Sequence, residues 1–225
     1  MFKKLILPCM AVIGCAALAL PAGAVAENKP TLEDSGGGVL PSGAKIVGTN
    51  AGEITVATTS GTPVTKCQAL KWTGEVTKNK EDAIEAKITT ADMWGANAAS
   101  SHNNLGECTE SPGGKFYVTF LRTPLLLQST PAMATDEFQL SGTGGNIRLL
   151  LGFTAAGECE YEATSNVKGD FTTGGTQASL TLRSTEGNGW KSIRGGFLCP
   201  TSFLLQMTLT LETESGESVK ITKTP

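Results

Sequence analysis

Apolar and polar residues alternate along most of the chain, and this period of two constrains the fold more than any other feature. The clearest case is residues 205–212, where Leu205, Met207, Leu209 and Leu211 alternate with Gln206, Thr208, Thr210 and Glu212. Successive side chains of a strand point to opposite faces, so this pattern predicts strands with one face on a core and one in water. Similar alternation occurs at residues 54–56, 71–76, 84–89, 116–120, 147–153 and 178–183.

Turn-forming residues separate the alternating segments, and no long stretch keeps the period of an amphipathic helix. Glycine-rich turn signals occur at residues 112–114, 142–146, 174–175 and 187–189. The best helical candidate, residues 80–86, alternates as a strand does. Many short strands with frequent turns predict an all-β protein, either an antiparallel sandwich or a barrel-like domain.

The first 26 residues are typical of a secretory signal peptide. Two lysines, Lys3 and Lys4, precede an apolar run over residues 5–20, and small residues at Ala24 and Ala26 form a cleavage site. We therefore expect cleavage after Ala26 and a secreted, extracellular protein. The alternative is a lipid anchor at Cys15, since residues 12–15 loosely fit a lipid-attachment box. The apolar residues that follow Cys15 favour ordinary cleavage.

The rest of the chain divides by composition into an arm and a folded region. Residues 27–44 contain Pro30, Pro41 and three successive glycines, with little to bury, which predicts a flexible N-terminal arm. Residues 45–225 form the predicted all-β domain and are numerous enough to bury a sizeable core. This region is either one domain or two small subdomains that divide near residues 130–136.

The charge of the chain limits its partners. The formal net charge is −3, and removal of Lys3 and Lys4 makes the mature chain more acidic. This argues against nucleic acid as a partner and against electrostatic docking on anionic lipid. No second apolar stretch approaches the roughly 20 residues that a membrane-spanning helix needs, so we expect no transmembrane segment in the mature chain.

Four cysteines remain after the signal peptide: Cys67, Cys108, Cys159 and Cys199. In an oxidising compartment we expect them to form disulfides, and four cysteines allow three pairings. The spacing between the first two nearly equals the spacing between the last two, which favours Cys67–Cys108 and Cys159–Cys199. Each bridge would contribute about 4 kcal/mol in the chain-entropy account of disulfide stabilisation.

Three short motifs give the chain a resemblance to known proteins. They are residues 67–77 (CQALKWTGEVT), the triplet Cys159-Glu160-Tyr161, and residues 198–202 (LCPTS) before a final threonine-rich strand. In this layout the chain resembles a group of uncharacterised secreted β-rich proteins of actinobacteria, over roughly residues 44–211. The resemblance implies an extracellular all-β fold with two disulfides. It implies no activity, because none is assigned to that group.

We find no convincing catalytic set and expect no enzymatic activity, cofactor or metal. The one histidine, His102, lies in a small and polar segment, residues 92–106, that predicts a long surface loop. No Gly-x-Ser-x-Gly turn accompanies it, as a serine hydrolase of that kind requires. His102 with Cys108 leaves too few ligands for zinc.

Paired carboxylates could in principle hydrolyse glycosides. They fall where solvated polar faces are expected, so a secreted hydrolase is only the third hypothesis. The candidate pairs are Asp136–Glu137, Glu158–Glu160 and Glu212–Glu214.

Two tryptophans are the candidates for ligand binding. Trp94 opens the segment at 92–106 and Trp190 follows a Gly-Asn-Gly turn, whereas Trp72 lies on the apolar face of a predicted strand. The leading hypothesis is a non-enzymatic extracellular or cell-surface protein that acts by binding or as a structural module, with envelope components or glycans as candidate partners. The alternative is a secreted carbohydrate-binding module that stacks Trp94 and Trp190 on sugar rings.

Overall fold

The structure is a computed structural model that describes residues 29–67, 69–80, 83–94, 108–110, 115–121, 124–130, 133, 136–153, 157–184, 189–197 and 199–224. Every regular element in these residues is a β-strand, which confirms the all-β prediction. The strands are β1 (Lys29–Glu33), β2 (Lys45–Asn50), β3 (Ile54–Ala57), β4 (Pro63–Cys67), β5 (Ala69–Lys80), β6 (Ala83–Trp94), β7 (Cys108–Glu110), β8 (Lys115–Phe120), β9 (Leu125–Ser129), β10 (Glu137–Gly142), β11 (Arg148–Phe153), β12 (Gly157–Ala163), β13 (Val167–Phe171), β14 (Ser179–Arg183), β15 (Trp190–Arg194), β16 (Ser202–Thr213) and β17 (Lys220–Thr224).

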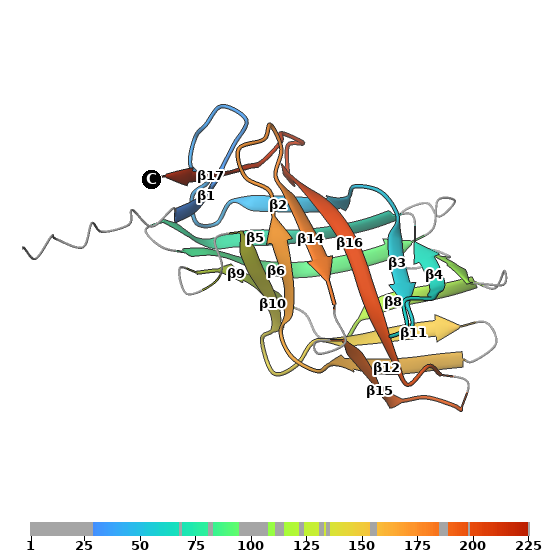
Figure 1. Ribbon diagram of the computed structural model, residues 1–225. Coiled ribbons are helices and arrows are strands. Elements are labelled where there is room, and N and C mark those ends of the chain that lie inside the picture. Colours follow the sequence, from blue (N-terminus) through green and yellow to red (C-terminus); the bar gives the residue numbers. More distant parts are fainter. Residues whose placement is uncertain are drawn as a thin grey trace, which may run out of the picture.

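Eight of these strands close into a barrel (Figure 1). The order around this first ring is β14-β13-β10-β9-β6-β5-β2-β16, and β16 pairs back with β14. The remaining strands of the large sheet form a second ring, β16-β15-β12-β11-β8-β7-β4-β3, which closes where β3 pairs with β16. The predicted barrel is therefore present. The additional strands form a series of pairings that begins and ends on β16, which is a member of the barrel.

Strand β16 belongs to both rings because its two halves have different neighbours. Its first half pairs with β15 through Phe203 and with β3 through Leu204, Leu205 and Gln206. Its second half pairs with β14 and with β2, the latter as far as Thr213. Alternate residues of the strand are buried, as the sequence predicted: Phe203, Leu205, Met207, Leu209 and Leu211.

The rings do not follow the order of the sequence. Each takes strands from both sides of residues 130–136, where the sequence allowed a division into two subdomains. The strands that flank those residues, β9 and β10, pair directly from Leu125 to Gln128. Further pairing of β6 with β8 joins the rings at a second place.

The N-terminal segment differs from the flexible arm predicted for residues 27–44. From Lys29 onward it is a strand and a loop packed on the first ring: β1 pairs with β17, and Leu32 and Leu40 are buried. The amide of Asn79 holds this segment, because it donates to the carbonyls of Leu32 and Leu40 and accepts from the Leu32 N–H. Gly37 lies in a turn at φ 86°, so the glycines serve a turn here.

No helix in the described part of the chain is long and apolar enough to cross a membrane.

Candidate functional site

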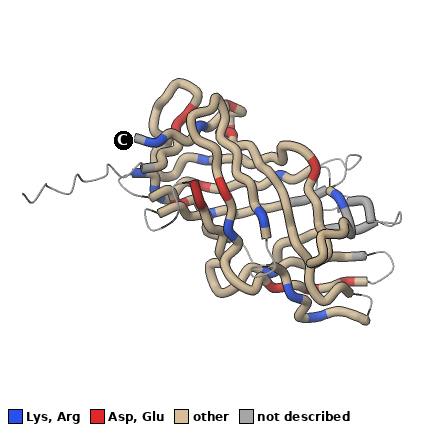
Figure 2. The backbone as a smooth tube through the Cα atoms, in the orientation of Figure 1, with Lys and Arg blue, Asp and Glu red and all other residues tan. Residues whose placement is uncertain are grey.

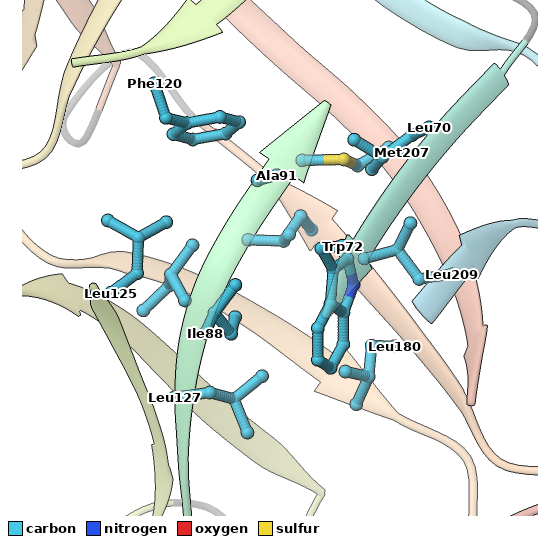
Figure 3. A pocket seen from close by; sticks show the side chains of 12 residues that line it. Leu70, Trp72, Ile88, Ala91, Phe120, Leu125, Leu127, Leu180, Met207 and Leu209 are labelled. Atoms are coloured by element: carbon cyan, nitrogen blue, oxygen red, sulfur yellow. The ribbon is translucent and has the colours of Figure 1, made fainter. Parts of the chain in front are cut away.

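Two gaps lie among described residues of the apolar interior, and both are too small for an organic ligand. The larger cavity lies among twelve apolar side chains, including Trp72, Phe120 and Met207 (Figure 3), and has a volume of about 20 Å³. A single water needs roughly 10–15 Å³ and two or more polar partners. A second cavity, beneath Leu32 and Ile221, measures about 10 Å³. Both are packing gaps in an apolar core.

The tryptophans do not form a ligand surface. Trp190 is 1% exposed and stacks on Phe203 with ring centroids 5.7 Å apart, so its prediction as a ligand-binding residue is wrong. Trp190 is the first residue of β15, and its side chain points into the core. The preceding turn did not indicate on which face of the strand this side chain would lie. Trp72 lies in the core, as predicted. The backbone of Trp94 ends β6, but its side chain lies outside what the structure describes.

The predicted loop at residues 92–106 falls mostly outside the described part of the chain. Its first three residues belong to β6 and continue the ladder with β5 as far as Trp94. Residues 95–107, and with them His102, are not described. The carbohydrate-binding alternative therefore depends on Trp94 alone.

Cations bind three carboxylates of the candidate pairs, Asp136, Glu137 and Glu160, and Glu212 accepts a hydrogen bond from the Gln177 amide at 3.4 Å. Arg148 on β11 donates to Glu160 at 3.3 Å and to Glu162 at 2.7 Å on β12. Lys168 lies 2.7 Å from Glu137, and Lys223 contacts Asp136. Among the described residues, no group of three or more His, Cys, Asp and Glu side chains could hold a metal ion.

One of the two favoured disulfides is described in full. Cys159 and Cys199 are bonded with Cα atoms 5.7 Å apart, which confirms that pairing and is compatible with an extracellular protein. Cys67 is also disulfide-bonded. The register of β4 with β7, Lys66 opposite Thr109, places Cys67 opposite Cys108. The Cys108 side chain lies outside the described part, so Cys67–Cys108 stays a prediction.

An exposed aromatic residue marks the end of the second ring. Phe197 is 95% exposed and Ile193 is 44% exposed. Both belong to the hairpin tip, which we define as residues 193–197 and 199–201, the end of β15 and the segment that leads to β16. Turn positions usually carry Gly, Pro, Asn, Asp or Ser. A phenylalanine in water at such a position is therefore the most informative surface feature of the described residues.

The Cys159–Cys199 disulfide links the hairpin tip to β12. The Cys199 N–H donates to the Gly196 carbonyl at 3.0 Å, which closes a tight turn around Phe197. A Cβ atom on Gly195, at φ +151°, would lie 2.3 Å from Cys199 Sγ. The turn, the glycine and the sulfur bridge to β12 thus hold Phe197 outward.

Two cations flank the apolar residues of the tip. Lys191 and Arg194 are exposed on β15. Figure 2 shows blue segments along this strand, which lies at the lower end of the molecule. In register they lie opposite Glu162 and Glu160, but Arg148 already binds both carboxylates. Neither cation forms an ion pair with another described residue.

Sequence reasoning missed Phe197 and Ile193. The signal was present as two glycines followed directly by an aromatic residue, with a cysteine two positions further on. That combination places a large apolar side chain in a braced turn.

Comparison with known proteins adds no functional information. No protein-family model, no curated protein and no solved structure matches the chain. The resemblance to secreted actinobacterial proteins stays a prediction, and function must be argued from the geometry.

Proposed function

We propose that the protein is exported, that the residues up to Ala26 are removed, and that the mature protein acts by contact with a component of the cell envelope. Catalysis has no part in this proposal. The observation that carries it is the exposed Phe197 on a disulfide-braced turn.

Export is supported by the signal-like N-terminus and by the disulfide chemistry. The run of apolar residues after Lys3 and Lys4 ends at a small-residue cleavage site. The Cys159–Cys199 bridge favours a compartment outside the reducing cytoplasm.

The arrangement of the described residues supports a function by contact and not one by catalysis. The two cavities lined by described core residues measure about 20 and 10 Å³. The carboxylates at Glu160 and Glu162 are bound by Arg148 on an outer face. Burial of Phe197 against a partner would contribute about 1.5–3 kcal/mol, which corresponds to roughly tenfold or more in affinity.

The export part is tested by expressing the full precursor in an actinobacterial host, a choice that follows from the resemblance above. Mass spectrometry of the exported protein is expected to show a mature N-terminus at Glu27. Retention of the intact precursor in the cytoplasm would contradict export. An acylated N-terminus at Cys15 would contradict cleavage after Ala26.

The contact part is tested by sedimentation with isolated cell envelopes. Wild-type protein is expected to sediment with them, and Phe197→Ala should lower the bound fraction about tenfold. The matched control is Val39→Ala, because Val39 is 55% exposed and lies in the loop after β1, at the other end of the molecule (Figure 1). Equal binding of the wild type and Phe197→Ala would overturn the proposal.

A further inference from the structure

We infer that the hairpin tip binds the interface of an anionic lipid membrane, with Phe197 and Ile193 in the headgroup region and Lys191 and Arg194 beside lipid phosphates. This inference names the partner of the contact site proposed above and rests on that proposal. It follows from the exposed apolar side chains, the two cations next to them and the rigidity of the turn.

The apolar part of the tip is too small for a specific protein interface and sufficient for a membrane. A stable protein interface needs about 800 Å² from each partner, spread over some 20–30 residues. Near the tip, only Phe197 and Ile193 are large exposed apolar side chains among the described residues. A bilayer surrounds an inserted side chain on all sides, so a single protruding ring can be fully buried there.

The position of the tip allows this insertion. It lies beyond the end of β15, at the opposite side of the molecule from β1 and β17 (Figure 1). Phe197 has 95% of its surface in water, so neighbouring described residues scarcely cover it. The ring can therefore enter a surface without any rearrangement of the barrel.

The charges beside the tip match an anionic surface. Lys191 and Arg194 are exposed, and their stems can lie along the apolar layer while the charged ends reach phosphate groups. The carboxylates next to them are engaged: Arg148 binds Glu160 and Glu162, and Glu158 has an interaction of its own. The two cations are therefore available to a partner.

The acidic character of the whole chain does not oppose this local contact. The formal net charge is −3, which argued against docking on anionic lipid when charge was considered for the whole chain. At physiological ionic strength, however, charges more than about 8 Å apart are largely screened. A membrane at the tip therefore responds mainly to the charges nearest to it, which are the exposed Lys191 and Arg194 together with Glu160, Glu162 and the Arg148 that binds them.

The brace beneath the tip lowers the entropic cost of insertion. The Cys159–Cys199 bridge and the hydrogen bond from Cys199 N–H to Gly196 hold the turn in one conformation. A segment that is already ordered loses little conformational freedom when it binds. Binding should consequently weaken when the bridge is removed.

The test is flotation of the mature protein with vesicles of phosphatidylcholine alone and of phosphatidylcholine with phosphatidylglycerol in equal parts. Wild type is expected to float with the anionic vesicles and to bind them less as salt is raised. Phe197→Ala should lower the partition coefficient about tenfold, and Phe197→Trp should retain it. The double variant Lys191→Gln/Arg194→Gln should abolish the preference for anionic vesicles, whereas Val39→Ala should bind as wild type does.

Two results would overturn the inference: no flotation of wild type with either vesicle, or equal flotation of wild type and Phe197→Ala. Circular dichroism of each variant checks that the surface substitutions leave the fold intact. Lipid-extracted envelopes separate this inference from the proposal on which it rests. Binding to them that still depends on Phe197 would refute the lipid partner and leave the contact function standing. Envelope binding that is independent of Phe197 would refute both.

Discussion

The indole Nε1 of Trp72 lies 2.0 Å from the point that a Cβ atom on Gly48 would occupy. The two residues are directly opposite each other on β5 and β2, so the ring folds across the neighbouring backbone. Phe138 and Gly169 repeat this relationship between β10 and β13, with Phe138 Cζ 2.5 Å from the corresponding point. In both pairs a glycine makes room inside the first ring for an aromatic side chain.

Gly48→Ala should therefore lower the free energy of unfolding by about 1–3 kcal/mol, because the added methyl group overpacks the core. Urea denaturation of the purified mature protein measures the change. Gly144→Ala is the matched control, since a Cβ atom there meets nothing within 4 Å. If Gly48→Ala and Gly144→Ala unfold at the same urea concentration, the close approach of Trp72 does not explain why position 48 is a glycine.

Asn79→Ala should loosen the N-terminal segment. The variant loses three hydrogen bonds to Leu32 and Leu40, and leaves buried backbone groups unpaired, at a cost of about 2–4 kcal/mol. Hydrogen exchange should show much faster exchange at the Leu32 amide. Asn166→Ala serves for comparison, because its side chain reaches only Gln139 on the surface. Unchanged protection at Leu32 would contradict the role of Asn79.

Peptide mapping without reduction should recover two linked pairs, Cys67–Cys108 and Cys159–Cys199. The second pair is described directly, and the register of β4 with β7 supports the first. The double variant Cys159→Ala/Cys199→Ala should lose about 4 kcal/mol of stability, the chain-entropy value for a loop of this length. A peptide that links Cys67 to Cys159 would rule out this connectivity.

Stability should fall steeply at alkaline pH because of Tyr161. Its side chain is fully buried and donates a hydrogen bond to the Pro200 carbonyl at 2.9 Å, and burial raises the pKa of the phenol. Below the unfolded pKa of about 10 the proton is bound in both states, so stability does not change with pH through this group. Above it the unfolded chain releases a proton that the folded chain retains, and stability is lost as pH rises.

The variant Tyr161→Phe isolates this effect. It should cost about 1 kcal/mol at neutral pH, through the lost hydrogen bond, and should then show a shallower decline above pH 10 than the wild type. Thermal unfolding across a pH series makes the comparison. Parallel curves for the two proteins would show that other groups, such as lysines in ion pairs, cause the alkaline loss.

The sequence predicted the strands in which apolar and polar residues alternate clearly, but it did not predict which strands pair with one another. The pattern from Leu205 to Leu211 indicated the buried face of β16 correctly, because parity along a strand is a local property. Which strands lie beside β16 depends on closure of both rings, and contacts between distant segments decide that. Three strands of 12 residues are also longer than the many short strands expected.

The predictions from sequence were wrong where one local pattern is compatible with two different structures. Glycines around Gly37 suggested flexibility, but they form a turn, while Leu32 and Leu40 anchor the segment and a distant Asn79 holds it. Trp190 was a candidate for ligand binding because it follows a turn, yet its side chain is buried and stacks on Phe203. Phe197 was overlooked because its signal, two glycines before an aromatic residue, indicates a turn but not whether the aromatic side chain faces water.

The membership of β16 in two closed rings has a consequence for the history of the protein. Without this strand, β14 and β2 would lose their shared neighbour in one ring, and β15 and β3 would lose theirs in the other. No contiguous piece of the chain contains all the strands of one ring and none of the other. The fold therefore offers no smaller module for duplication, exchange or fusion.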